Sequence, residues 1–197
     1  MSITHDPDTR RTRGRMIRAA AELMQRRGWY GAGLNDILER AQAPRGSLYH
    51  HFPGGKAALA TEGVRQTGLL FARQLTEAGA DKTDIGSYLR ALAELSGRDL
   101  TESAFEAACP VAAIALDAPQ AEEELMAACN EAFALWLVAI TDRLRPMMQR
   151  PDRADILARV VATTLLGGTM LARAGRTSEL LPLLAQDLAV LAEALDG

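Results

Sequence analysis

The sequence predicts an all-α protein with a small N-terminal domain of three helices and a larger helical C-terminal domain. Apolar residues recur at helical spacing along most of the chain, and no segment shows the apolar-polar alternation of a strand. A hydrophobic share of 48% with only 5% aromatic residues favours a helical core built from Ala and Leu. A chain of 197 residues is long enough for two small domains. We place them at 1–56 and 57–197, joined by a helix that begins near residue 55.

Helical periodicity, capping residues and breakers predict the individual helices. The first ends at Gly28, a candidate C′ residue, and residues 29–33 form a loop. Pro110 opens a helix near its first turn, and Pro119 follows its end. The predicted helices are 9–28, 34–41, 45–52, 54–80, 84–96, 102–108, 109–117, 122–146, 152–174 and 177–195. The apolar residues expected to line the last one are Leu180, Leu184, Leu188, Leu191 and Leu195.

Two short helices separated by a three-residue turn form the most informative segment. Leu34, Ile37, Leu38 and Ala41 make one apolar stripe on the first. In the second, only Leu48 and Phe52 need face inward, so the remaining side chains point outward. A helix that enters the major groove of DNA needs this arrangement, because exposed donors and acceptors read phosphates and base edges. The pattern predicts a helix-turn-helix domain, and its candidate DNA-binding residues are Asn35, Arg45, Gly46, Ser47, Tyr49, His50, His51 and Lys56.

Residues 10–60 resemble the N-terminal domain of the TetR family of regulators. The run 44–56, Pro-Arg-Gly-Ser-Leu-Tyr-His-His-Phe-Pro-Gly-Gly-Lys, is similar to the LmrA/YxaF-type subgroup, and so is the run 109–117. This resemblance implies a regulator whose C-terminal domain binds planar apolar molecules. The chain departs from many relatives in having Gln42 in place of Gly and Pro44 in place of an N-cap Ser. It departs from some relatives in having Gly167-Gly168 in place of a Glu-Gly pair.

The charge of the chain is unevenly distributed. Residues 1–56 hold ten Lys or Arg against five Asp or Glu, a net charge of +5, whereas the remainder holds twelve against twenty, a net charge of −8. A basic N-terminal quarter on an acidic body is typical of a domain that meets phosphate. The alternative interpretation is a solvated basic helix, and the helix-turn-helix motif favours the DNA interpretation over it.

Cysteine and histidine usage predicts neither a metal site nor a cofactor. Cys109 and Cys129 do not form a C-x-x-C pair, and His5, His50 and His51 are the only histidines. Free thiols indicate a reducing cytoplasm. The chain shows no signal-peptide pattern, and charges interrupt the apolar stretches, so we expect no membrane association.

The C-terminal domain has six bulky residues that are candidates for an effector pocket. Each is also consistent with ordinary core packing, which is the more frequent role of such residues. The candidates are Phe71, Phe105, Met126, Phe133, Trp136 and Met170.

The sequence therefore predicts a transcriptional regulator, a repressor that leaves a near-palindromic operator when a small apolar or aromatic effector binds. We expect a homodimer joined by residues 152–195, because these helices carry more apolar surface than one neighbour covers. An enzyme is not expected, because no nucleophile-base spacing, phosphate loop or paired-carboxylate motif is found. The remaining alternative is a helical ligand-binding or dimerisation protein that does not bind DNA. The operator, the regulated gene and the effector stay open.

Overall fold

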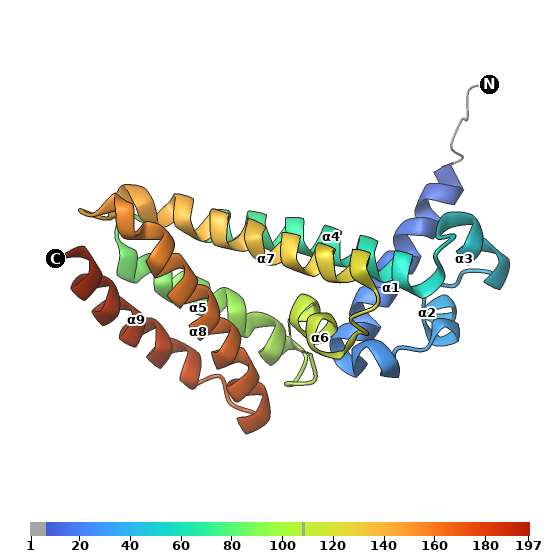
Figure 1. Ribbon diagram of the computed structural model, residues 1–197. Coiled ribbons are helices and arrows are strands. Elements are labelled where there is room, and N and C mark those ends of the chain that lie inside the picture. Colours follow the sequence, from blue (N-terminus) through green and yellow to red (C-terminus); the bar gives the residue numbers. More distant parts are fainter. Residues whose placement is uncertain (1–6, 108) are drawn as a thin grey trace, which may run out of the picture. The chain divides into compact units, whose positions relative to one another are not determined.

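The computed structural model describes residues 7–107 and 109–197, and within them it is all-α, without a strand (Figure 1). The α-helices are α1 (Pro7–Gly31), α2 (Leu34–Arg40), α3 (Arg45–His51), α4 (Gly55–Ala78), α5 (Ile85–Glu102), α6 (Pro110–Asp117), α7 (Glu123–Leu144), α8 (Ala154–Gly175) and α9 (Leu180–Asp196). Short 3-10 turns at Arg145–Met147 and Pro151–Arg153 lie between α7 and α8. The predicted fold class is confirmed.

The chain forms two compact units that differ from a simple division at one residue. Unit 1 is the chain up to Thr67 together with Pro110–Asn130, and unit 2 is Gly68–Cys109 together with Glu131–Gly197. Helices α4 and α7 therefore each contribute residues to both units. The boundary predicted at residue 56 followed the helix-turn-helix motif alone, and the sequence did not indicate that α6 packs against α1 in the same unit.

In unit 1, α1 packs against both α2 and α6. The core side chains of this unit include Met16, Met24, Ile37, Leu48 and Leu59, all fully buried. The side chain of Arg15 adds a polar tie, because its Nε donates a hydrogen bond to the Ala41 carbonyl at 2.9 Å. This bond joins α1 to the end of α2 and holds the entry to the helix-turn-helix turn.

The turn between α2 and α3 closes with the paired backbone bonds of a Schellman motif. The Gln42 N–H donates to the Glu39 carbonyl and the Ala43 N–H donates to the Leu38 carbonyl, both at 2.9 Å. Gln42 adopts a φ of +50°, the left-handed conformation that favours glycine. Pro44 then occupies the N-cap of α3 without a side-chain capping bond. The chain thus keeps the turn geometry despite having Gln42 and Pro44 at these positions.

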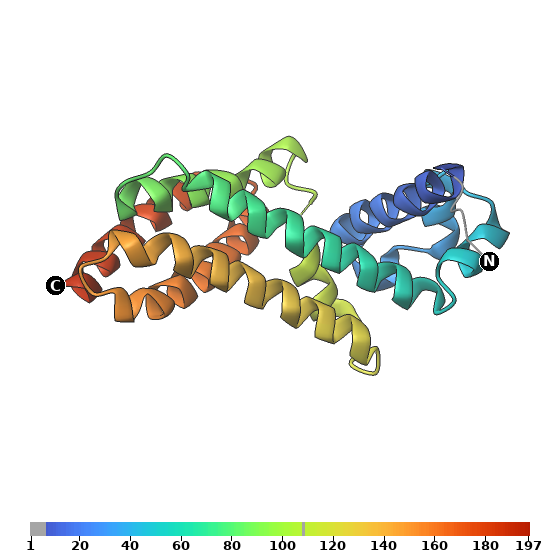
Figure 2. The same cartoon turned by 90° about the horizontal axis from the view of Figure 1, so that it is seen from above.

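In unit 2, α5, α8 and α9 pack against one another, and α4 lies beside α7 (Figures 1 and 2). The α4–α7 contact is close at Gly68, where a Cβ atom would lie 2.7 Å from the Cβ of Ala132. Trp136 is buried next to this contact, and its Nε1 donates to the Gly68 carbonyl at 2.9 Å. A side chain larger than hydrogen at position 68 would force the two helices apart.

Two local predictions are wrong. The helix predicted at 102–108 is not formed over its described residues, 102–107, because α5 ends at Glu102 and both Ala104 and Phe105 have positive φ, of 53° and 66°. The predicted lining of the last helix is wrong in part, because α9 buries Leu181, Ala185 and Ala192 beside Leu188, and the predicted Leu191 is 49% exposed. The other predicted leucines are half-buried, and Leu184 lies against Gly168 of α8. Leucines on both sides of α9 made its inner and outer faces look alike.

Two helical stretches, Glu123–Met147 and Pro151–Gly175, are long and apolar enough to cross a membrane by length and composition alone. The prediction that every apolar stretch falls short of this criterion is therefore wrong. In each, 39% of the most apolar window is buried inside the fold, and α8 packs against both α5 and α9. Their apolar character is that of core helices.

Candidate nucleic-acid interface

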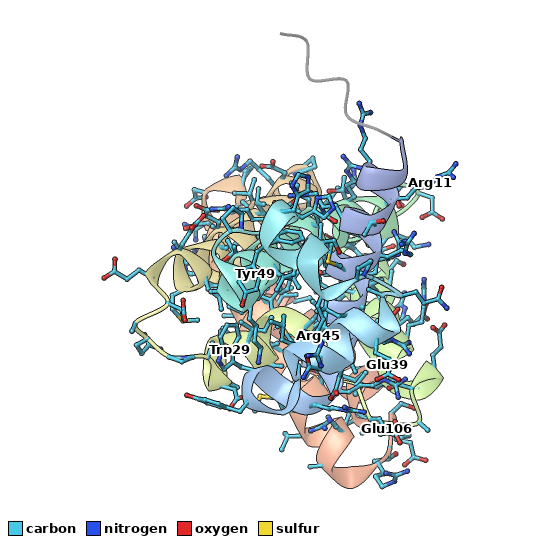
Figure 3. The ribbon with its side chains drawn as sticks, turned by 90° about the vertical axis from the view of Figure 1, so that its right-hand side faces the viewer. Arg11, Trp29, Glu39, Arg45, Tyr49 and Glu106 are labelled. Carbon is cyan, nitrogen blue, oxygen red and sulfur yellow. The ribbon has the colours of Figure 1, made fainter. Side chains whose placement is uncertain are left out.

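Helix α3 is anchored by two side chains and exposes most of the others. Leu48 is 0% exposed and Phe52, the residue that follows the helix, is 3% exposed. Tyr49 is 62% exposed, and Arg45 and His50 are exposed as well. Figure 3 labels Arg45 and Tyr49 on this helix. Donors thus surround a small apolar anchor, which is the arrangement expected of a helix that contacts DNA.

The other predicted contact residues on α2 and α3 differ in exposure and in the interactions they make within the chain. Asn35 is exposed in the first turn of α2, and a Cβ atom added to Gly46 would meet nothing within 4 Å. The Ser47 hydroxyl donates to the Pro44 carbonyl at 2.6 Å, so this donor is used within α3. The rings of His50 and His51 lie edge to face, with 5.1 Å between their centroids.

Several arginines of α1 support the helix-turn-helix rather than standing free beside it. Arg13 pairs with Glu62 of α4 at 3.3 Å, and its guanidinium lies 5.2 Å from the centroid of the Phe52 ring. Arg27 pairs with Asp36 of α2 at 3.1 Å. Part of the positive charge of residues 1–56 is therefore compensated locally, and the exposed Arg11 and Arg45 leave charge available at the surface (Figure 3).

Lys56, in the first turn of α4, is directed toward the end of α1. Its Nζ donates a hydrogen bond to the Trp29 carbonyl and lies 4.6 Å from the centroid of the Trp29 ring, a cation-π distance. Partial burial lowers the pKa of Lys56 below its ordinary value, and the charge of Asp117 opposes that shift. An ammonium has three donors, so this inward bond leaves two for a phosphate.

Asp117, the last residue of α6, binds the end of α1, a role that the sequence does not indicate. Gly28 breaks α1 with φ 69° and ψ −176°. Asp117 lies against this break, because a Cβ atom at Gly28 would sit 2.5 Å from the Asp117 Oδ2. The Tyr30 N–H donates to that oxygen at 3.2 Å. The sequence predicts a helix end at Gly28, but nothing in it pairs Gly28 with a residue 89 positions away.

Three of the six candidate effector residues come together in unit 2. The ring centroid of Trp136 lies 4.8 Å from that of Phe71 and 5.3 Å from that of Phe133, and both pairs are edge to face. Phe105 is half-buried in the segment after α5, and Met170 is 53% exposed on α8. Met126 belongs to unit 1, so the six residues do not form one cluster within a unit.

Two hollows in the described residues can be compared with the predicted pocket. One of ≈ 10 Å³ lies among α1, α4 and α6 of unit 1, with Met24, Val64 and Ile114 in its wall. It is large enough for about one water molecule. The other, of ≈ 370 Å³, opens on unit 2 and is lined mainly by charged residues such as Lys82, Arg90 and Glu94. None of the six candidate residues lines either hollow.

Among the described residues, no group of three or more His, Cys, Asp or Glu side chains is placed to hold a metal ion. Cys109 is half-buried and Cys129 is buried, and neither forms a disulfide. The site is therefore described by its basic, hydroxyl and imidazole side chains alone.

Comparison with known proteins defines the class to which this site belongs. Residues 16–62 match the family model for bacterial regulatory proteins of the tetR family. The chain belongs to the TetR family of DNA-binding transcriptional regulators. Residues 86–187 match the model for the C-terminal domain of LmrA/YxaF-like transcriptional regulators, which places the chain in that subgroup. The resemblance noted in the sequence is confirmed in both halves of the chain.

Individual relatives support the same assignment. The chain is 34% identical over 168 residues to the HTH-type transcriptional regulator LmrA of Bacillus subtilis, covering 85% of this chain and 89% of LmrA. It is 26% identical over 180 residues to YxaF of the same organism, an uncharacterized HTH-type regulator, covering 91% and 94% of the two chains. The crystal structure of a TetR-family regulator from Cytophaga hutchinsonii has the same fold, with a TM-score of 0.81, 19% identity and 98% coverage of both chains. These relatives are regulators, so the alternative of a helical protein without DNA binding is not supported.

Proposed function

We propose that this protein is a cytoplasmic repressor that binds a near-palindromic operator as a homodimer and leaves it when a small apolar or aromatic effector binds the C-terminal domain. The observation that carries the proposal is α3, whose Leu48 is fully buried while Arg45 and Tyr49 are exposed. Because the chain belongs to a family of DNA-binding regulators, we infer that this exposed face contacts DNA.

In the proposed complex, α3 lies in the major groove. Arg45 at its first turn reads a guanine edge, because a guanidinium matches the two acceptors of that base. Tyr49 and Lys56 contact phosphates through a hydroxyl and an ammonium, and Asn35, Gly46, Ser47, His50 and His51 complete the contact surface. Phosphate contacts fix the register and base contacts give the sequence preference.

The dimer is proposed to form through α8 and α9. These helices bury one face against each other and α5, yet they also expose large apolar side chains that unit 2 does not cover. Those side chains are Ile156, Met170, Leu171, Leu183, Val190 and Leu191. Two helices from each chain would make a four-helix interface. The α3 helices of the two chains would then enter the major groove on successive turns of DNA.

The effector is proposed to bind near the aromatic cluster of Phe71, Phe133 and Trp136. Helix α4 carries Phe71 and, near its first residue, Lys56. An effector that shifts α4 would therefore move Lys56, one of the proposed phosphate contacts. Neither of the two hollows described above is lined by the three aromatic residues. A pocket beside them is therefore proposed to open when the effector binds, which makes effector affinity depend on the state of the protein.

Two binding experiments test the proposal. A gel-shift assay with the DNA upstream of the protein's own gene should show a specific complex, and a map of bound genomic sites identifies the operator. Candidate apolar compounds are then titrated into free and DNA-bound protein. Coupling of binding sites is reciprocal and typically 1–3 kcal/mol, so an effector should bind the DNA-bound protein at least about fivefold more weakly. Equal affinity in both states would contradict release by an effector.

A further inference from the structure

We propose that Asp117 is a positioning residue for DNA binding, which holds the end of α1 and the Lys56 ammonium in the arrangement that the recognition surface needs. The inference rests on the proposed DNA contacts of α3 and Lys56. It assigns a role in DNA affinity to a residue of α6, which lies outside the helix-turn-helix motif and contributes no side chain to the proposed contact surface.

Asp117 holds the end of α1 through a hydrogen bond that it accepts from Tyr30. After the break at Gly28, the backbone makes one further helical turn, with the Ala32 N–H donating to the Gly28 carbonyl at 3.2 Å. The first N–H groups of a helical turn have no partner within it. Asp117 accepts the Tyr30 N–H at 3.2 Å and so caps this turn from a different element.

Lys56 of α4 binds the same turn. The carbonyl of Trp29, next to the capped amide, accepts the hydrogen bond from the Lys56 Nζ, and the charge of Asp117 acts on this ammonium. The single turn at residues 28–32 is therefore held from α6 by a carboxylate and from α4 by an ammonium. Lys56 lies five residues after the end of α3, so the anchoring of this lysine bears directly on the recognition surface.

Gly28 allows the Asp117 carboxylate to lie directly against the backbone of this turn. A Cβ atom there would lie 2.5 Å from the Asp117 Oδ2, and the φ of 69° is one that residues other than glycine rarely adopt. The Asp117 carboxylate and the Gly28 backbone thus lie so close together that a larger residue at position 28 would collide with the carboxylate. A substitution at Asp117 removes this contact without inserting an atom into it, which makes Asp117 the better position for a test.

The test uses the intact chain and a duplex that the wild-type protein selects from a random-sequence pool. Asp117→Ala and Glu124→Ala are compared by fluorescence anisotropy of the labelled duplex. Glu124 is a matched control, because it is an exposed acid of unit 1 that pairs with Arg65 at 3.3 Å. Both variants remove one negative charge. Charge alone predicts equal or tighter DNA binding for both, whereas a positioning role predicts about fivefold weaker binding for Asp117→Ala only.

Asp117→Asn separates the two interactions. Its amide oxygen can still accept the Tyr30 N–H, but it carries no charge toward Lys56, so we expect an affinity between those of wild type and Asp117→Ala. Trp29 supplies a readout that needs no DNA, because it is one of only two tryptophans. In a Trp136→Phe background, Asp117→Ala should shift the Trp29 emission and Glu124→Ala should not.

The outcomes distinguish this inference from the proposed function. If the wild-type protein selects no duplex, DNA binding itself is contradicted, and the Trp29 emission still decides whether Asp117 holds the turn. If the wild type binds DNA and Asp117→Ala binds as tightly as Glu124→Ala, the positioning role is wrong. Unchanged Trp29 emission in both Asp117 variants would also overturn it.

Discussion

Helix α3 and the α8–α9 surface are both exposed helical faces, but the exposed side chains of α3 are polar and those of the α8–α9 surface include large apolar ones. On α3, the buried anchors are few and the outward side chains are Arg45, Tyr49 and His50. On α8 and α9, the buried residues are many and the outward side chains still include Leu171 and Val190. An apolar face left in water favours association with another apolar face, whereas a face of donors favours phosphate and bases.

This difference shows how the side chains outside a core identify a partner better than those inside it. Leu48 in α3 and Leu188 in α9 are 0% and 1% exposed, and neither side chain indicates what its helix binds. The exposed Tyr49 and Val190 do indicate it, because one is a polar donor and the other is apolar. The two surfaces should therefore be sensitive to different changes: the α8–α9 surface to an added charge, and the α3 surface to the loss of a positive charge. The experiments below use that contrast.

The largest effect is expected from charge placed on the apolar surface. Val190→Glu puts a carboxylate where 67% of an apolar side chain is exposed, and burying it in a dimer interface would cost several kcal/mol. We expect monomers in sedimentation or light scattering at micromolar concentration. DNA affinity should fall about a hundredfold or more, because two linked half-site contacts become independent.

Leu69→Glu is the matched control for this experiment. Leu69 is also an exposed apolar residue of unit 2, but it lies on α4. We expect the Leu69→Glu protein to remain dimeric. A dimeric Val190→Glu protein beside a monomeric Leu69→Glu protein would move the interface from α8–α9 to α4 and contradict our proposal.

A smaller effect is expected from Arg45→Ala on the polar surface. Loss of a base contact should weaken binding to the selected duplex by about 1–3 kcal/mol and relax the sequence preference at one position. The melting temperature should not change, because the side chain is exposed. Arg98→Ala, which removes an exposed arginine from α5, should leave DNA affinity nearly unchanged; a loss as large as that of Arg45→Ala would indicate a general effect of charge.

The smallest effect is expected from Lys56→Ala, and salt dependence reveals its nature. A lost phosphate contact should lower the slope of log K against log salt by about 1. Loss of the bond to Trp29 alone would weaken binding at every salt concentration without changing the slope. Lys82 is the only other lysine of the chain and pairs with Asp81 at 3.0 Å, so Lys82→Ala is the control for removing one ammonium.

The helix-turn-helix could be predicted because its determinants are local. The stripe from Leu34 to Ala41 and the two anchors Leu48 and Phe52 lie within 19 consecutive residues, and the structure buries Ile37, Leu38, Leu48 and Phe52 as expected. The turn tolerates Gln42 at positive φ, which costs about 1 kcal/mol relative to glycine. A local pattern with several consistent signals withstands one unfavourable residue.

The parts that could not be predicted depend on distant contacts or on weak local contrast. The bond from Tyr30 to Asp117 joins residues 87 positions apart, and the bond from Lys56 to Trp29 joins residues 27 apart. Ala104 and Phe105 carry ordinary helix-forming side chains, yet their backbones are left-handed. There the Ser103 hydroxyl accepts the Ala107 N–H at 3.0 Å, an interaction that competes with a helix and has no sequence signature strong enough to identify.

The inclusion of Pro110–Asn130 in unit 1 has a consequence for how regulators of this kind exchange parts. A hybrid made by grafting residues 1–56 onto another C-terminal half would separate Gly28, Tyr30 and Lys56 from their own Asp117. The hybrid would contain α3 and Lys56 but not the carboxylate that caps the end of α1. Transplanting a DNA specificity therefore requires moving two stretches of chain together, and inheritance by simple recombination at a single crossover would tend to yield weakened hybrids.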